Sequence, residues 1–400
     1  MRRVPEKIAR VALAAVAALL LTAAGKSPAT LKDAYHGDFY FGAAINAAQI
    51  AGFDGRGDAL IEANFNSISP ENALKWASVH PQPEIYDFRL ADLYVSYGEN
   101  HRMYIVGHSL VSQRQTPAWV FRDNKGNLLN REALLDRMQE HIEAVVGRYK
   151  GKIQSWDVVN EALNDDGSLR QSLWLKIIGP DYIEKAFEFA HEADPQALLT
   201  YDDYDLENEA KRKGAISLIK KLKADGIPIG CVGLQNHDSL TWPSAAQEDA
   251  AISAFAALGV KVAISELDVS VLPSAGNDST ADLSMSQPAG SQADPEVVAS
   301  FDPDTGPRID PKLNPYPTSL PASVQQELAR RYSELFSVFL RHRGAISRVT
   351  LWGVTDADSW LNDKPVLGRA DYPLLFDRTG QPKPAFDAVL HAAADASTRR

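Results

Sequence analysis

Glu161 and Glu266 each stand at the end of a short apolar segment, Ser155–Glu161 and Lys261–Leu267. Both segments contain β-branched side chains, which favour buried strands. A carboxyl group at the end of a buried strand lies where water is scarce, and this environment favours its protonated form. Two such groups can serve as the acid and the nucleophile of a retaining glycosidase. Alternatively, each glutamate begins a loop and is solvated.

Eight short apolar segments recur along the chain and are predicted to be strands. They are roughly Tyr40–Ala47, Asn66–Glu71, Tyr104–Val111, Ser155–Glu161, Ala197–Asp203, Ile229–Gln235, Lys261–Leu267 and Arg348–Val354. Helical periodicity lies between them, for example in Arg131–Tyr149, Glu209–Ala224 and Gln325–Arg341. Alternating strands and helices predict an α/β fold with a parallel sheet, and eight units fit a closed (β/α)₈ TIM barrel. An open doubly wound sheet is the alternative, but no glycine-rich dinucleotide motif follows the first segment.

Polar side chains follow nearly every predicted strand, which is where a barrel of this type places its active site. They are Asn46, Glu71, Asn72, His108, Asn160, Glu161, Asp202, Asp203, Tyr204, Gln235, Asn236, His237, Glu266, Asp268 and Trp352. One shared barrel mouth explains this recurrence better than eight separate solvated loops. We therefore expect these side chains to converge on one site.

Residues 30–395 are predicted to form a single catalytic domain, interrupted by the segment 271–321 between the seventh strand and the seventh helix. This segment is rich in proline and acidic residues and has little periodicity. Loops of this length are usually functional or disordered. We expect it at the active-site mouth, either as a wall of the cleft or as a mobile flap.

The N-terminus predicts an exported protein. Four basic residues precede the apolar run Val11–Ala24, which is too short for a confident membrane span. We expect residues 1–24 to be a signal peptide and the mature protein to be secreted or periplasmic, without membrane attachment. An uncleaved N-terminal anchor is the alternative.

The composition limits the classes of molecule that the protein is expected to bind. A net charge of −11 argues against nucleic acid, because its binding needs a basic face. The single cysteine, Cys231, lies in an apolar run and is most simply a core residue without a disulfide. No histidine or cysteine cluster has metal-ligand spacing, so neither a metal nor a cofactor is predicted. We expect a monomer.

Six motifs of the chain together resemble glycoside hydrolase family 10, the endo-β-1,4-xylanases, over roughly residues 34–390. The motifs are Glu71-Asn72-Ala73-Leu74-Lys75-Trp76, Gly107-His108-Ser109-Leu110-Val111, Trp156-Asp157-Val158-Val159-Asn160-Glu161, Gln235-Asn236-His237, Ser265-Glu266-Leu267-Asp268 and Trp352-Gly353-Val354-Thr355-Asp356. Each stands at a predicted strand end, and they occur in the expected order.

The resemblance implies that Glu161 is the general acid/base and Glu266 the nucleophile. Retention of configuration requires the two carboxyl groups to lie about 5–5.5 Å apart. His237 resembles the histidine that hydrogen-bonds the nucleophile, with Asp268 behind it. Asn160 resembles the residue that binds the 2-hydroxyl of the sugar, and Gln235 lies near the acid/base in the family.

The resemblance also implies the sugar-binding walls. The residues that resemble the hydroxyl-binding wall on the non-reducing side are Glu71, Asn72, Lys75, His108 and Gln115. Trp352 and Trp360 resemble its aromatic roof, and Tyr204 resembles an aromatic residue on the leaving-group side. For each tryptophan taken alone, a role in the core is the alternative.

The chain departs from the family pattern in two places: Ser112-Gln113-Arg114-Gln115 stands where the family usually has Trp-His-Ser-Gln, and two aspartates stand where asparagine is usual. Ser112 stands where the family has a tryptophan beside the reacting sugar, which predicts a hole of roughly indole size, open to a bulkier sugar or filled by Arg114 or by the long loop. Asp202 and Asp205 stand where asparagine is usual, and we expect an aspartate near Glu161 to repel its charge.

The sequence thus predicts a retaining hydrolase that cleaves internal β-1,4-xylosidic bonds, with xylan or xylo-oligosaccharides as its substrate. One alternative is the same chemistry on another β-glycoside, such as decorated xylan, an aryl or steroidal glycoside, or a β-glucan. A second is a non-catalytic carbohydrate-binding barrel. Such proteins lose at least one catalytic carboxylate, and both are present here.

Overall fold

The computed structural model describes residues 30–273, 301–302, 306–307, 312–363 and 368–398. The predicted signal peptide lies outside this range, and so does most of the segment 271–321. Within that segment, β9 (Phe301–Asp302) and β10 (Gly306–Pro307) pair as a short antiparallel ribbon.

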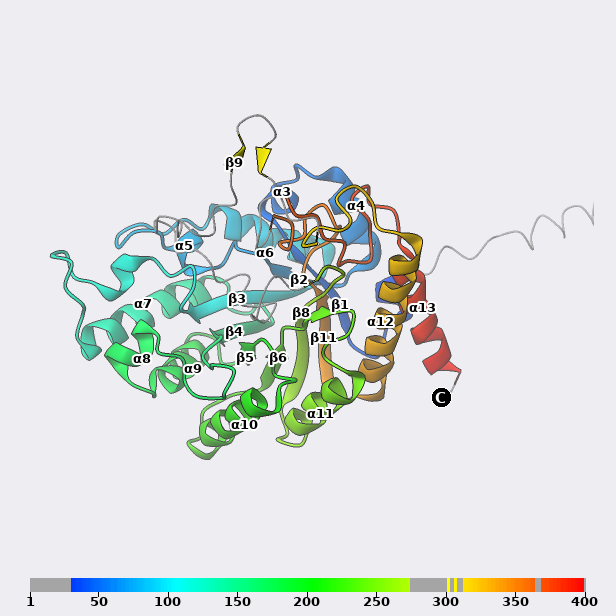
Figure 1. Ribbon diagram of the computed structural model, residues 1–400. Helices are drawn as coiled ribbons and strands as arrows, with labels where there is room; N and C mark the ends of the chain where they lie inside the picture. Colours follow the sequence, from blue (N-terminus) through cyan, green and yellow to red (C-terminus); the bar gives the residue numbers. More distant parts are fainter. Residues whose placement is uncertain (1–29, 274–300, 303–305, 308–311, 364–367, 399–400) are drawn as a thin grey trace, which may run out of the picture.

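Eight parallel strands form a closed ring, because the last strand, β11, pairs with both β1 and β8. This confirms the predicted (β/α)₈ barrel, which Figure 1 shows with helices packed around the strands. The ring consists of β1 (Tyr40–Ile45), β2 (Ser67–Pro70), β3 (Tyr104–Ser112), β4 (Ser155–Asn160), β5 (Leu198–Asp203), β6 (Cys231–Leu234), β8 (Lys261–Ser270) and β11 (Ile346–Leu351).

Helices precede, connect and follow the strands. They are α2 (Leu31–Ala34), α3 (Ala47–Ile50), α4 (Gly55–Asn64), α5 (Trp76–Val79), α6 (Arg89–His101), α7 (Arg131–Arg148), α8 (Leu173–Ile178), α9 (Tyr182–Ala193), α10 (Glu209–Ala224), α11 (Ala245–Ala256), α12 (Ala322–Arg341) and α13 (Pro384–Ser397), with the 3₁₀ turn η1 (Ala118–Phe121). None of the helices in the described part of the chain has the length and apolarity needed to cross a bilayer.

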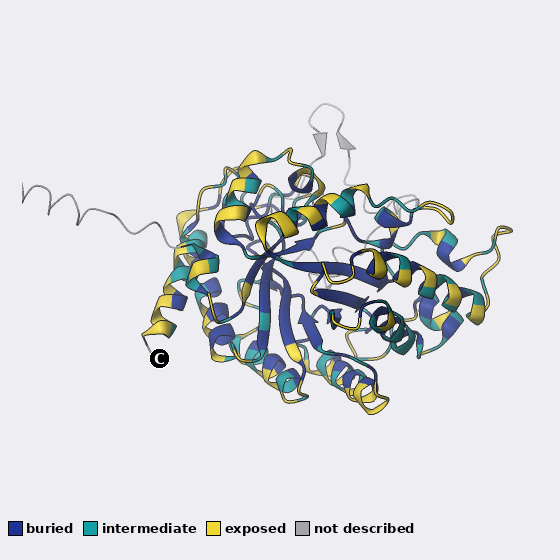
Figure 2. Cartoon of the chain, turned by 180° about the vertical axis from the view of Figure 1, so that it is seen from behind, coloured by how far each residue is buried: buried dark blue, intermediate teal, exposed yellow. Residues whose placement is uncertain are grey.

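Burial explains why the strand segments look apolar. Nearly every strand residue is buried, whereas the outer faces of the helices are exposed (Figure 2). A strand covered on both faces needs continuous rather than alternating hydrophobicity. The thiol of Cys231 is buried in β6, as predicted.

One strand is longer than predicted. β8 continues three residues beyond Leu267, so Glu266 lies within the strand rather than at its end. The extension exists because the short strand β7 (His237–Ser239) pairs with it outside the ring and matches His237 to Asp268. This added pairing supports the residues that surround Glu266.

Candidate active site

The strand register brings three positions to one level beside Glu161. Ser112 of β3 pairs with Asn160 of β4, and Asn160 pairs with Asp202 of β5. Glu161 follows directly, and its backbone N–H donates to the carbonyl of Asp202 at 2.9 Å. Its φ of 58° lies in the left-handed region, which costs a non-glycine residue about 1–3 kcal/mol. The surrounding hydrogen bonds therefore hold Glu161 at this point against a local strain.

The contacts of the Glu161 carboxylate described here all come from groups that carry N–H donors. Its Oε1 accepts from Nδ2 of Asn160 at 3.3 Å and from Nε2 of Gln235 at 3.2 Å. Its Oε2 lies 3.3 Å from Nε of Arg114, a residue on the loop between β3 and η1. The predicted neighbours Asn160 and Gln235 are thus in place, and Arg114 joins them.

Glu266 is buried beside two histidines. Nε2 of His237 lies 3.1 Å from Oε2 of Glu266, and Nδ1 of the same ring lies 3.2 Å from Asp268. Nε2 of His108 lies 3.8 Å from Oε1 of Glu266. Trp360 donates its indole N–H to Asp268 at 2.6 Å, which fixes the far end of this chain of contacts.

These contacts keep Glu266 ionised. Burial alone would raise the pKa of Glu266, but the hydrogen bond from His237 and the nearby charges of His108, His237 and Lys75 outweigh it and lower the pKa below its usual value. Burial likewise opposes the charge of His237, yet Asp268 and Glu266 raise its pKa well above the usual value. The pair is therefore an imidazolium beside a carboxylate, as a nucleophile requires.

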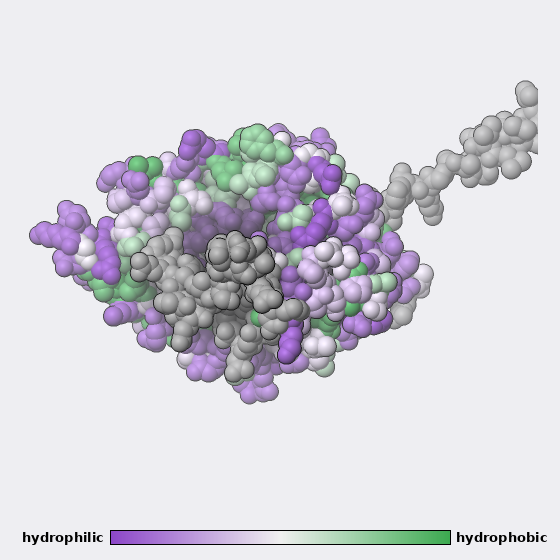
Figure 3. Space-filling view, turned by 45° about the horizontal axis from the view of Figure 1, so that its top comes forward, coloured by the Kyte–Doolittle hydropathy of each residue, from purple (hydrophilic) through white to green (hydrophobic). Residues whose placement is uncertain are grey.

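The predicted hydroxyl-binding wall is assembled beside this pair. Asn72 accepts from Lys75 at 3.2 Å and from Gln115 at 2.9 Å through a single oxygen, Oδ1. Lys75 is half-buried, and its charge acts on Glu266, Glu71 and Glu161. Figure 3 shows hydrophilic side chains around a recess on this side of the molecule.

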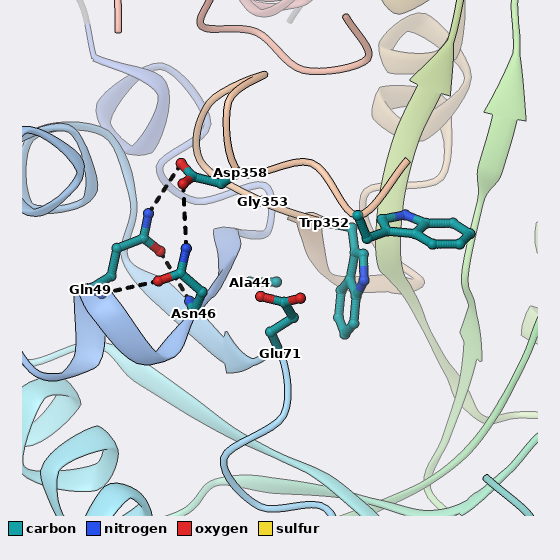
Figure 4. A pocket seen from close by; sticks show the side chains of 8 residues that line it. Ala44, Asn46, Gln49, Glu71, Trp352, Gly353 and Asp358 are labelled. Atoms are coloured by element: carbon teal, nitrogen blue, oxygen red, sulfur yellow. Dashed lines mark hydrogen bonds between the residues drawn. The ribbon is translucent and has the colours of Figure 1, made fainter. Parts of the chain in front are cut away.

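Trp352 and Trp360 lie where the predicted roof should be. The indole of Trp352 meets the ring of His108 edge-on, with 5.4 Å between the ring centroids. The indole of Trp360 meets His237 in the same way, with 4.9 Å between the centroids. Both tryptophans line one pocket with Glu71, whose carboxylate points into it (Figure 4). An indole beside hydroxyl-binding groups matches a sugar, which has apolar C–H faces and polar edges.

This pocket contains Asn46, which the sequence placed at the barrel mouth, and also Gln49 and Asp358, which the sequence interpretation did not assign to the site. Asn46 and Gln49 cap helix α3 reciprocally, and both amides reach Asp358 at 3.4 Å (Figure 4). Their signal in the sequence is an ordinary helix-capping pattern. Asp358 lies in the loop after β11, and its position follows only from the folded loop.

Tyr204 differs from its expected role. Its side chain is buried, Nζ of Lys211 lies 3.1 Å from the ring centre, and Arg170 donates to its hydroxyl. A cation therefore covers one face of the ring, so Tyr204 is not an open platform for sugar stacking. The motif places an aromatic residue correctly but does not reveal the basic neighbours that cover it.

The predicted hole beside Ser112 is much smaller than an indole ring. The cavity there has a volume of about 10 Å³, enough for a water molecule. The carbonyl of Ser112 accepts from the indole of Trp174 at 2.9 Å, and its hydroxyl accepts from the backbone N–H of Arg114 at 3.1 Å. Trp174 and Arg170 line this cavity, whereas Arg114 turns toward Glu161, and the long loop lies mostly outside the described residues.

Asp202 does not supply the negative charge expected beside Glu161. Burial, followed by the charges of Asp157 and Glu266, raises the pKa of Asp202 well above its usual value. Its carboxyl oxygens accept from Ser265 at 2.6 Å and from Gln235 at 3.3 Å. Both oxygens of Asp202 thus accept, whereas an asparagine side chain has one accepting oxygen and an amino group that donates. Burial also raises the pKa of Asp205, to about 6.

His108, Asp202 and Glu266 form the one group in the described part of the chain whose ligand atoms lie close enough together to hold a metal ion, within 4.8 Å of one another. Linear spacing could not reveal this group, since it comes from three strands. Asp202 would have to lose its proton and its present partners to bind a cation. No step of the chemistry described below uses a metal.

Comparisons with known proteins agree with this geometry. The model of glycosyl hydrolase family 10 matches residues 30–392. The chain belongs to glycosyl hydrolase family 10. It is 40% identical to endo-1,4-beta-xylanase A of Xylanibacter ruminicola over 93% of this chain and 95% of the relative, and 38% identical to a beta-1,4-xylanase of Dictyoglomus thermophilum over 92% of each. The family resemblance seen in the motifs is thereby confirmed.

Solved structures of family 10 share the fold over nearly the whole chain. An endoxylanase from a sugarcane soil metagenome superimposes with a TM-score of 0.82 at 42% identity, covering 91% of this chain and 99% of the other. A xylanase of Paenibacillus barcinonensis superimposes with a TM-score of 0.77 at 34% identity, covering 92% of this chain and 99% of the other. The departures at Ser112, Arg114 and Asp202 therefore lie within an otherwise typical family 10 barrel.

The charge of His237 predicts a shift in the pH profile of His237→Asn. Without the imidazolium, the pKa of Glu266 rises, because a neutral amide stabilises the carboxylate less. The acid limb of the pH profile of kcat/KM should therefore move to higher pH. The profile is measured with an aryl xylobioside between pH 3 and pH 7. The exposed His36→Asn serves as the control and should leave the limb in place. An acid limb that stays at the wild-type pH in His237→Asn contradicts the role of His237.

The neutral state of Asp202 predicts a stability that depends on pH. Unfolding exposes Asp202, which then ionises above about pH 4, so its burial lowers the stability of the fold increasingly as the pH rises toward its folded pKa. Asp202→Asn removes this effect. The melting temperature of Asp202→Asn minus that of wild type at the same pH should increase from pH 5 to pH 8. The exposed Asp136→Asn should show no such trend. A constant difference across this range refutes the prediction.

Proposed function

We propose that this chain is a retaining endo-β-1,4-xylanase that cleaves xylan by double displacement. The observation that carries the proposal is the ionised, buried Glu266, held between two histidines and facing the mouth that also holds Glu161. Family membership supports the reaction class, and the xylanases among the relatives support the substrate. A related structure is described as a complex with xylotriose.

In the first half-reaction, Oε1 or Oε2 of Glu266 attacks the anomeric carbon of the bound xylose. The glycosidic bond breaks, its electron pair moves to the leaving oxygen, and Glu161 supplies the proton that this oxygen needs. His237 keeps Glu266 in orientation through the contact at 3.1 Å. The product is a glycosyl ester on Glu266.

In the second half-reaction, Glu161 accepts a proton from water while the water oxygen attacks the same carbon. The ester bond breaks, and its electron pair restores the carboxylate of Glu266. Esterification removes one negative charge from a site that still contains Lys75 and His237. This change favours the ionised form of Glu161 when a base is needed.

The cleft residues assign the sugar contacts. One wall of the cleft offers hydrogen-bonding groups, which belong to Glu71, Asn72, Lys75 and Gln115. Apolar surfaces above this wall come from Trp352 and Trp360. In the free structure Asn160 binds both Glu161 and Gln235, so it positions the acid/base as well as facing the sugar. A xylan or xylo-oligosaccharide chain is the ligand that these groups fit.

Replacement of each glutamate tests the assignment. Glu266→Ala should lower kcat on xylan by about 10⁴-fold or more. Glu161→Ala should lower it by about 10²–10⁴-fold, with a much smaller loss of kcat/KM on 2,4-dinitrophenyl β-xylobioside, whose leaving group needs no proton. Added azide should restore turnover by Glu161→Ala and give β-xylobiosyl azide as the product. With Glu266→Ala, azide should also restore turnover, but the product should be the α-anomer.

The same assay decides between substrates. Purified xylan, decorated xylan, β-glucan and aryl cellobioside are compared at equal enzyme concentration, with circular dichroism confirming that each variant is folded. Activity on aryl cellobioside with none on xylan would exclude the xylanase assignment. Full turnover of xylan by Glu266→Ala would exclude Glu266 as nucleophile.

We also propose that the protein is exported and acts as a monomer. The basic residues before the apolar run Val11–Ala24 support a cleavable signal peptide. Expression of the full chain, followed by intact mass measurement of the exported protein, should show loss of about the first 24 residues. A full-length mass in the membrane fraction would indicate an N-terminal anchor instead.

A further inference from the structure

Arg114 makes a contact with the proposed acid/base that the family motif does not provide. Its Nε lies 3.3 Å from Oε2 of Glu161, and its side chain is about four-fifths buried, with 21% of its surface exposed. The family pattern has serine at this position, and serine carries no charge. A permanent cation has therefore been placed against the carboxyl group that must alternately release and accept a proton.

The two carboxyl oxygens of Glu161 have different surroundings. Oε1 already accepts from Asn160 and Gln235, so Oε2 is the oxygen left to exchange a proton with the substrate. A guanidinium carries only donors. The charge of Arg114, whose Nε lies 3.3 Å from Oε2, attracts Glu161 more strongly as a carboxylate than as a neutral acid.

We propose that Arg114 is a positioning residue for the second half-reaction: its charge holds Glu161 as an ionised, oriented base. The inference rests on the proposed roles of Glu161 and Glu266. In this step water loses a proton to Oε2 of Glu161, the water oxygen bonds to the anomeric carbon, and the electron pair of the ester bond returns to Glu266.

The neighbouring substitution at Ser112 makes room for this arrangement. The hydroxyl of Ser112 accepts from the backbone N–H of Arg114 at 3.1 Å, which turns the loop so that the side chain reaches Glu161. The water-sized cavity of about 10 Å³ beside Ser112 is lined by Glu161 itself. A tryptophan at position 112 would have no hydroxyl to accept from the backbone of Arg114, so the two departures from the family pattern act together.

Arg114→Gln separates the two half-reactions when 2,4-dinitrophenyl β-xylobioside is the substrate. Its first half-reaction needs no acid, so kcat reports the second half-reaction and kcat/KM reports the first. We expect kcat to fall about tenfold, the factor that one charge-assisted contact contributes, while kcat/KM stays within twofold. Azide, which needs no base, should restore kcat. Arg114→Lys should retain most of it, and the exposed Arg122→Gln should match wild type.

Three outcomes would overturn the inference. An unchanged kcat in Arg114→Gln would show that Glu161 needs no help as a base. Equal losses in kcat and kcat/KM would show that Arg114 binds substrate instead. A loss of kcat that azide does not restore would place the defect outside base catalysis.

Glu161→Ala, measured in parallel, distinguishes this failure from failure of the proposed function. If azide rescues Glu161→Ala and has no effect on a slow Arg114→Gln, only the inference about Arg114 is wrong. If azide does not rescue Glu161→Ala, the assignment of the acid/base itself is wrong.

Discussion

The site depends on keeping one carboxylate ionised inside a barrel that excludes most water. Glu266 is 5% exposed, and burial on its own would favour its neutral form. His237, His108 and Lys75 surround it and reverse that preference. Because each of these groups is itself costly to bury, each needs further partners, and much of the polar architecture at this end of the barrel exists to supply them.

Those further partners link the site to the barrel strands. Asp268 supports His237, and Trp360 donates to Asp268. Asp157 of β4 contacts His108 at 3.1 Å and Arg348 of β11 at 3.2 Å, so the same carboxylate spans the barrel interior. Closure of the sheet between β8 and β11 therefore does more than complete the fold: it brings the counter-charges together.

The sequence could predict the parts of the site that follow from strand order. Alternating strands and helices implied the barrel, and motifs at strand ends located Glu161, Glu266 and His237 near one another. The extension of β8 by β7 was not predictable, since a three-residue strand has almost no signal of its own. Side-chain contacts were equally hidden: the cation over Tyr204 and the small cavity at Ser112 depend on how neighbouring loops pack.

Three of the departures from the family pattern become one feature when the register is considered. Ser112 and Asp202 flank Asn160 at the same level of β3, β4 and β5, and Arg114 reaches Glu161 from the loop that Ser112 anchors. Burial raises the pKa of Asp202 well above its usual value and so disfavours a charge at this position. Arg114 is the substitution that changes the electrostatics, and it acts on Glu161 alone of the proposed catalytic pair through direct contact. Variation in this barrel has thus left the nucleophile and its counter-charges intact and has altered the environment of the residue that carries the proton.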